Sequence, residues 1–231
     1  MLEFRDVSVD LGDFRLTADF AVAAGARVAV IGPSGAGKST LLALVSGFLR
    51  PDRGQVLWQG RDLAPLPPGQ RPVSVLFQDQ NLFPHLSVAQ KVGLGLRPDL
   101  RLAPGQHEQV ARALARVGLE GMAERRPAQL SGGQQSRVAL ARVLLRARPI
   151  LLLDEPFGAL GPALKAGMLD LLAEIAGESG ATVLMVTHDP EDARRFAGET
   201  IVIHDGRAEP PLPTGPLLDD PPPGLRAYLG G

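Results

Sequence analysis

Residues 32–40 of the chain are Gly32, Pro33, Ser34, Gly35, Ala36, Gly37, Lys38, Ser39 and Thr40. This stretch fits the phosphate-loop pattern G-x-x-x-x-G-K-[ST]. The apolar run 27–31 before it is typical of a buried strand, and apolar residues recur at helical spacing over 38–48 after it. The alternative is a glycine-rich corner between strand and helix that binds nothing. Lys38 and Ser39 of the pattern instead favour a site for a nucleoside triphosphate.

Two side chains of this loop have separate predicted tasks. Lys38 is expected to bridge the β- and γ-phosphates, and the Ser39 hydroxyl is expected to ligate Mg²⁺. The N-terminus of the following helix adds partial positive charge at the same place. The sequence therefore predicts that the loop binds a nucleoside triphosphate together with Mg²⁺.

The composition is that of an ordinary globular protein. The chain has 231 residues, of which 45% are hydrophobic and 21% charged, and its formal net charge is −1. Because this balance is nearly neutral, it gives no sign of a nucleic-acid or anionic-membrane surface. The absence of cysteine excludes disulfides and thiolate metal sites. Neither a signal peptide nor a run of about 20 apolar residues is expected, so any membrane role would come through a partner.

Hydrophobic patterning predicts a doubly wound α/β core with additions. Short alternating segments at 2–9, 14–22 and 55–59 favour a small antiparallel sheet. Continuous apolar runs at 149–153, 182–187 and 200–204 are typical of strands covered on both faces. We expect a nucleotide-binding domain over 1–207, a helical insertion over about 79–148, and a proline-rich extended tail over 208–231.

Helices are predicted from spacing and from start signals. Amphipathic patterns cover 106–117 and 137–147, the second with Val138, Ala141, Leu144 and Leu145 inward. Pro162 and Pro190 each occupy an expected first helical position.

Polar side chains follow the predicted strands where each strand ends. Asp154 and Glu155 follow one apolar run, and His188 and Gln78 follow two others. Ligands of open α/β sheets lie at this edge. Asp154 is therefore expected to hold Mg²⁺, and Glu155 to take a proton from an attacking water. His188 would contact the γ-phosphate or orient that water, and Gln78 would bind the attacking or Mg²⁺-bound water; solvated polar strand ends are the alternative.

A second predicted helix start also suits an anion. It contains Ser131, Gly132, Gly133 and Gln134. Taken alone, such a segment is more often a simple serine cap. One such helix start lies in the predicted core and the other in the predicted helical insertion. This arrangement suggests a phosphate site formed by two copies of the chain, each contributing one helix start.

These motifs, in this order, resemble those of the ATP-binding subunits of ABC transporters. The resemblance covers about residues 1–207 and implies a P-loop NTPase ABC ATPase core with an antiparallel β subdomain and a helical subdomain that carries the signature motif, residues 131–134. It implies that two copies pair head to tail around ATP and that Glu155-assisted hydrolysis reopens them. It also implies that the Gln78 region contacts an integral membrane permease, at the cytoplasmic face of the bacterial inner membrane, with no nucleic acid involved.

A narrower resemblance rests on the segments 71–78 and 81–90 and on residues 92–96. These look like the ATP-binding subunit of bacterial thiamine importers, which take up thiamine and its phosphates with a periplasmic solute-binding protein. Import of another solute, such as iron, a polyamine or an anion, stays open, because the solute does not touch this subunit.

Two positions depart from the family pattern. Gly161 stands where the family usually has aspartate, and Leu11 stands where an aromatic ring usually lies under adenine, with Phe14 nearby. The first departure motivates a second hypothesis, an ATP-gated interaction module with weakened hydrolysis. A soluble ABC protein of translation or DNA repair is disfavoured, since the chain has neither a second cassette nor a long coiled coil.

Overall fold

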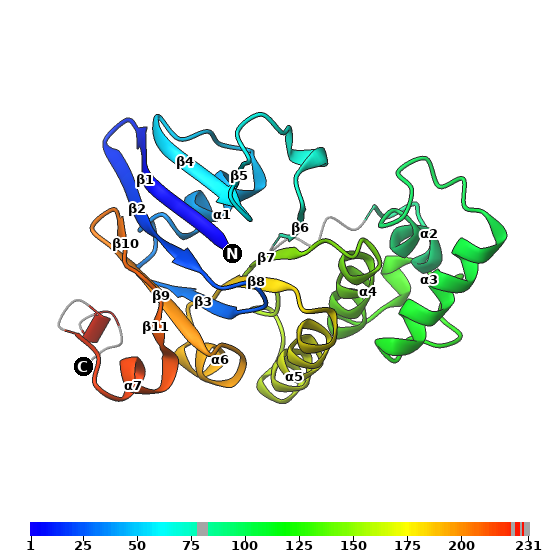
Figure 1. The fold of residues 1–231 in the computed structure, drawn as a ribbon. Coiled ribbons are helices and arrows are strands. Elements are labelled where there is room, and N and C mark those ends of the chain that lie inside the picture. The colour runs from blue at the N-terminus through cyan, green and yellow to red at the C-terminus, as the bar shows by residue number, and fades with distance from the viewer. Residues whose placement is uncertain (78–82, 223–224, 227, 229–231) are drawn as a thin grey trace.

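One curled sheet combines antiparallel and parallel strand pairing (Figure 1). The computed structural model describes residues 1–77, 83–222, 225–226 and 228. The antiparallel part contains β1 (Leu2–Leu11), β2 (Phe14–Val22), β4 (Arg53–Trp58) and β5 (Arg61–Asp62). The parallel part contains β3 (Arg27–Ile31), β6 (Val73–Leu76), β7 (Ile150–Asp154), β8 (Thr182–Val186) and β9 (Glu199–His204). The predicted antiparallel sheet is confirmed, and it is continuous with the parallel one.

The short strand β10 (Arg207–Ala208) joins the two parts, since it pairs with β2 on one side and with β9 on the other. The strand order is β5-β4-β1-β2-β10-β9-β3-β8-β7-β6, and β11 (Leu212–Pro213) also pairs with β9. All five residues of β8 are buried, as expected for a strand covered on both faces.

Helices cover the sheet on two sides and form a separate group beyond it (Figure 1). Helix α1 (Lys38–Ser46) lies between the two parts of the sheet and shares one core with both. Helices α5 (Pro162–Ser179) and α6 (Pro190–Phe196) cover the other face of the parallel strands. Both begin at the predicted prolines. The separate group contains α2 (Val88–Gly93), α3 (Pro104–Arg116) and α4 (Gly132–Leu145), and two short 3-10 turns lie at Pro68–Gln70 and Pro127–Gln129.

Two predicted helices differ from the structure. The first helix ends at Ser46 rather than residue 48, because Gly47 takes a left-handed conformation with φ of 87°. Phe48 is consequently exposed and faces Phe77, with ring centroids 5.9 Å apart.

Helix α4 begins at Gly132, not at residue 137, since Ser131 caps it. It contacts two cores: Ala139 and Leu140 face the sheet, whereas Val138 and Ala141 face α2 and α3. Leu144 and Leu145 are only partly buried, which corrects the single inward face predicted from the sequence.

The segment after residue 207 contains more structure than an extended tail. Besides β10 and β11, it forms α7 (Thr214–Asp219), whose Leu217 is buried in the core under α6. Its proline content indicates an extended chain, but pairing with β9 and apolar packing organise it. The domain boundary at 207 stays a prediction.

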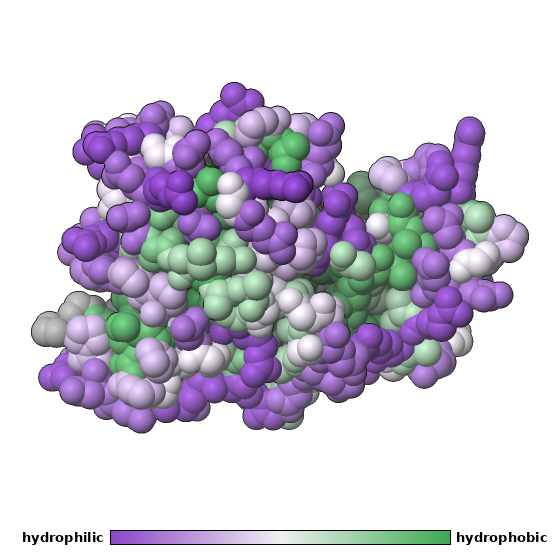
Figure 2. Space-filling model, in the orientation of Figure 1, coloured by the Kyte–Doolittle hydropathy of each residue, from purple (hydrophilic) through white to green (hydrophobic). Residues whose placement is uncertain are grey.

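The surface is mainly hydrophilic at its rim. On the face shown in Figure 2, hydrophobic residues gather in a band across the middle, including the place where the helical group meets the sheet. Among the described residues, no helix combines the length and apolar character needed to cross a membrane.

A buried arginine joins α1 to the loop before β6. Arg71 is 3% exposed, and its guanidinium donates to the carbonyl oxygens of Leu44 and Val45 at 2.7 and 3.0 Å, and to that of Leu66 at 3.0 Å. A Cβ at Gly47 would lie 2.5 Å from its Nε atom, so glycine is required there. Arg71 thus donates hydrogen bonds to carbonyls at the C-terminus of α1, the helix that starts in the phosphate loop.

We predict that Arg71→Leu lowers the free energy of unfolding by about 3 kcal/mol, because buried carbonyls lose charged donors. Urea unfolding measures this loss. Arg112→Leu is the control, since Arg112 forms only an exposed pair with Glu108 and should stay within about 0.5 kcal/mol of the parent. Equal effects of the two substitutions would contradict the assigned role of Arg71.

Candidate functional site

The predicted phosphate loop lies between β3 and α1, and two of its glycines combine a positive φ with a close neighbour, backbone at one and a side chain at the other. Gly32 has φ of 152°, and a Cβ there would lie 2.1 Å from the carbonyl oxygen of Ile203. Gly37 has φ of 106°, and its Cβ would lie 2.7 Å from Cζ of Phe14. Side chains at either position would push the loop off the sheet edge.

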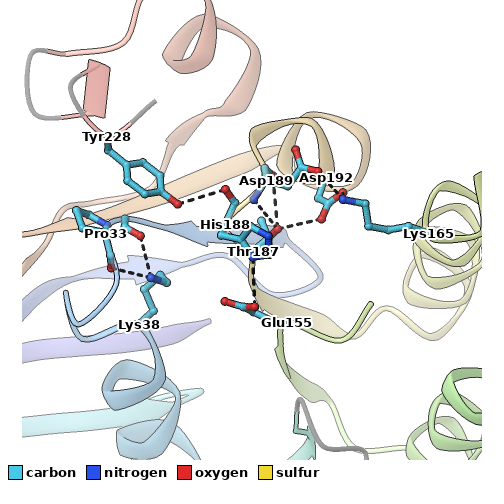
Figure 3. A network of polar contacts seen from close by, with 10 residues as sticks. Pro33, Lys38, Glu155, Lys165, Thr187, His188, Asp189, Asp192 and Tyr228 are labelled. Carbon is cyan, nitrogen blue, oxygen red and sulfur yellow. Dashed lines mark hydrogen bonds and ion pairs between the residues drawn. The ribbon is translucent and has the colours of Figure 1, made fainter. Parts of the chain in front are cut away.

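Lys38 curls back over this loop (Figure 3). Its Nζ donates to the carbonyl oxygens of Gly32 and Pro33, at 2.8 Å each. Burial lowers the pKa of Lys38, and the nearby Glu155 and Asp154 carboxylates act against this shift. No side chain caps the start of α1 at Gly37. A lysine over free helix-start amides fits a bound polyphosphate.

Asp154 ends β7 opposite the start of α1. Burial raises the pKa of its carboxyl group, while a hydrogen bond with Ser39 acts in the opposite direction. A desolvated carboxylate beside a hydroxyl is a donor set that suits Mg²⁺. No cluster of three or more histidines and carboxylates occurs in the part of the chain that the structure describes. Of the predicted Mg²⁺ ligands, Ser39 and Asp154 lie in the described part of the chain and come together here.

Glu155 and His188 face each other at the same sheet edge (Figure 3). The Nδ1 atom of His188 lies 3.2 Å from Oε2 of Glu155. Glu155 has a left-handed backbone with φ of 44°, and its amide donates to the Val186 carbonyl at 3.1 Å. Both side chains line a cavity of about 320 Å³ beside Ser136 and Leu160. The arrangement leaves room for a water next to a carboxylate.

The loop that carries His188 is held at both ends. Thr187 Oγ1 donates to Asp192 at 3.0 Å and accepts from the Asp189 amide at 3.1 Å. Asp189 caps α6 by accepting from the Glu191 amide at 3.0 Å. Lys165 of α5 pairs with Asp189, and with Asp192 at 2.8 Å. These contacts fix the loop relative to α5 and α6 (Figure 3).

The signature segment 131–134 lies in the helical group. Ser131 Oγ accepts from the Gln134 amide at 3.3 Å, and Gln134 Oε1 accepts from the Ser131 amide at 3.0 Å, which forms a capping box. A Cβ at Gly133 would lie 2.3 Å from Leu164 Cδ2, so α4 and α5 approach closely there. The serine cap is confirmed, and a role toward a partner's ATP stays a prediction.

Other predicted positions have mixed outcomes. Gln78 lies outside the described residues. Leu11 is 45% exposed, whereas Phe14 packs on Gly37 of the phosphate loop. The sequence interpretation missed Tyr228, whose hydroxyl reaches the His188 carbonyl; its place after a proline-rich stretch gave no sign of this contact.

Known proteins resemble this chain over nearly all its length. A family model described as ABC transporter matches residues 17–158. The chain belongs to the ABC transporter family. The "Thiamine import ATP-binding protein ThiQ" of Cereibacter sphaeroides is 66% identical over 230 residues, with 100% of both chains covered. The protein of the same name from a Ruegeria species is 60% identical over 230 residues, also with 100% of both covered.

Solved structures agree with this membership. The dimeric structure of a post-hydrolysis state of the ATP-binding cassette MJ0796, bound to ADP and Pi, has a TM-score of 0.79 and 31% identity to this chain. It covers 93% of this chain and 99% of its own. The predicted fold, a P-loop ABC ATPase core with an antiparallel β subdomain and a helical subdomain, is confirmed.

The position that departs from the family, Gly161, caps α5 without a side-chain bond. Its backbone is extended, and a Cβ at this position would meet nothing within 4 Å. An aspartate therefore fits there without strain and can accept from the first amides of α5.

We predict that Gly161→Asp is more stable than Gly161→Ala by about 1 kcal/mol, because only aspartate supplies a cap and a favourable charge at the helix start. Alanine controls for the lost backbone freedom that both substitutions share. Urea unfolding of the two variants gives the difference, and equal stabilities would show that no capping bond forms.

Proposed function

We propose that this chain is the ATP-binding and hydrolysing subunit that energises an importer of thiamine and its phosphates. The observation that carries the proposal is the convergence of Lys38, Asp154, Glu155 and His188 at one sheet edge. The curated relatives named as thiamine import ATP-binding proteins support the solute. Family membership supports coupling to transport.

In this proposal each side chain has one task in hydrolysis. Lys38 leaves the Gly32 and Pro33 carbonyls and binds the β- and γ-phosphates. Ser39 and Asp154 would hold Mg²⁺, which when bound would neutralise charge that develops on the phosphate oxygens. Glu155 accepts the proton of the attacking water, and His188, placed by its contact with Glu155, donates toward the γ-phosphate.

The proposal includes a second copy of the chain. The signature residues belong to the helical group, which lies to one side of the sheet in Figure 1, whereas the phosphate loop starts at β3. The similar cassettes of known structure are described as dimers. Residues 131–134 of one copy would bind the ATP held by residues 32–40 of the other, so ATP closes the pair and hydrolysis opens it.

A groove of about 700 Å³ is the proposed contact with the permease. Its lining includes Phe48, Phe77, Phe83, Arg142 and Arg146, and the three rings are exposed. Burial, together with the charge of Arg146, lowers the pKa of Arg142. No carboxylate among the described residues pairs with either arginine. An apolar permease segment that carries a carboxylate would complement this surface.

A buried lysine lies near Arg142 of this groove without lining it. Lys91 is 1% exposed, and its Nζ lacks a hydrogen-bond partner within the described part of the chain. Burial lowers its pKa, and so does the charge of Arg142. An added carboxylate would therefore stabilise several cations at once. By this contact the chain would lie on the cytoplasmic face of the inner membrane.

We predict that Glu155→Gln lowers ATP turnover by about 100-fold or more, because the amide cannot accept the proton. ATP binding should be unchanged, as measured by equilibrium titration beside the turnover assay. Glu174→Gln, an exposed site on α5, is the matched control and should leave turnover unchanged. Normal turnover in Glu155→Gln would rule out Glu155 as the base.

We also predict that Arg146→Glu weakens association with the permease by about tenfold or more, because it reverses a charge in the groove. ATP turnover of the isolated chain should stay within about twofold, since the groove is separate from the Glu155 cavity. Arg112→Glu, on the outer side of α3, is the control. Unchanged copurification of Arg146→Glu with the permease would refute this contact.

The solute is tested with the complete transporter. The chain is purified in mild detergent with the permease that accompanies it, and ATP turnover is measured with the periplasmic binding protein loaded with thiamine. We expect turnover to rise with thiamine-loaded protein and not with the empty one. Stimulation by iron, a polyamine or an anion instead would reassign the solute.

A further inference from the structure

A distant tyrosine contacts the loop that carries His188. Tyr228 is the only tyrosine of the chain, and its hydroxyl donates to the backbone carbonyl oxygen of His188 across 3.2 Å (Figure 3). Among the described residues it is the only donor found for this oxygen. The ring is half-buried and packs against the core under α6.

The segment that delivers Tyr228 is anchored at several points. The Thr214 and Thr200 hydroxyls share a buried hydrogen bond of 2.9 Å, which fixes the start of α7 on β9. Leu225 is 1% exposed and packs in the same core as Phe196 of α6. Arg226 pairs with Asp220 at 3.1 Å. Tyr228 is therefore held in place by packing rather than by its hydroxyl alone.

The hydroxyl binds the carbonyl side of the His188–Asp189 peptide, whose amide side donates to Thr187 Oγ1 at 3.1 Å. Thr187 and Asp189 are held through their side chains, but the His188 side chain has only Glu155 as its partner among the described residues. A change at the 188–189 peptide alters ψ of His188, and with it the backbone position from which the imidazole reaches Glu155. A hydrogen bond to the His188 carbonyl opposes that change.

Charges near the hydroxyl keep it in its donor form. Burial raises the pKa of Tyr228, and the Glu155 and Asp189 carboxylates raise it further. The other titratable groups of this loop and of the helices that hold it are His188, Asp192 of α6 and Lys165 of α5, the last paired with both Asp189 and Asp192. At neutral pH the phenol therefore stays protonated, whereas a phenolate would repel the carbonyl oxygen.

We propose that Tyr228 is a positioning residue for ATP hydrolysis, whose hydroxyl holds the His188 carbonyl and so keeps the imidazole beside Glu155. The inference rests on the proposed function, because it gives His188 and Glu155 their tasks in hydrolysis. A merely structural Tyr228, which only anchors the segment after α7, is the opposing result of the test.

Tyr228→Phe keeps the ring and removes only the hydroxyl. We expect kcat for ATP to fall about fivefold, the loss of one neutral hydrogen bond, with KM within about twofold. Thr214→Val is the matched control, since it removes a hydroxyl from the same segment without touching His188. It should lower Tm by about 2–4 °C and leave kcat unchanged. A lower Tm with unchanged kcat in Tyr228→Phe would overturn the proposal.

A second measurement separates positioning from anchoring without a mutation. Because the chain has one tyrosine, growth on 3-fluorotyrosine labels residue 228 alone and lowers its phenol pKa. The alkaline loss of kcat should move to lower pH in the labelled protein, in step with ionisation followed by ¹⁹F NMR. If the loss of kcat at alkaline pH occurs at the same pH in the labelled and unlabelled proteins, the proposal is also overturned.

The Glu155→Gln variant distinguishes failure of the positioning role of Tyr228 from failure of the hydrolysis roles on which it rests. If Glu155→Gln abolishes turnover while Tyr228→Phe and the fluorotyrosine protein behave as the parent, only the positioning role is lost. If Glu155→Gln retains turnover, the tasks that the proposed function gives to Glu155 and His188 in hydrolysis fail, whatever Tyr228 does.

Discussion

The close approach of Gly32 to the Ile203 carbonyl is the constraint on which the rest of the site depends. A backbone that passes so near β9 can turn directly from β3 into α1, which brings the first amides of α1 to the strand ends. The same edge receives Asp154 from β7 and His188 after β8 because these strands run parallel to β3. Any side chain at position 32 would displace the loop from the edge at which the other groups converge.

Helix α1 transmits this constraint into the fold. It lies between the antiparallel and parallel parts of the sheet, so its apolar residues belong to a core shared by both. Arg71 serves its last carbonyls, while Lys38 and the free amides mark its first turn. Both ends of the helix are therefore fixed, and the position of the loop follows from packing rather than from a ligand.

The sequence predicted the strands and the residues at their ends because both are local patterns. Each apolar run became a strand of the parallel sheet, and each strand-end residue that the structure describes lies at the expected edge. It could not predict that β10 would join two sheets, since pairing of a two-residue strand depends on its neighbours. It also missed Tyr228, because a contact over 40 positions leaves no periodic signal in the chain. For α4, single-face periodicity failed because the helix packs against two cores at once.

Helix α4, helix α5 and the His188 loop contact one another in that order, from the groove to the reacting groups. Arg142 and Arg146 lie near one end of α4, and the signature residues form its other end. Gly133 packs on Leu164 of α5, and the next residue, Lys165, pairs with Asp189 beside His188. A rigid helix moved at the groove would therefore act on the His188 loop through two side-chain contacts. Contact along this path does not by itself couple the groove to the His188 loop. The two are coupled only if substitutions at Leu164 and Lys165 have non-additive effects on ATP turnover in a double-mutant cycle. Such an interaction is expected because Leu164 and Lys165 are adjacent on α5, so a shift of this turn of the helix moves both residues.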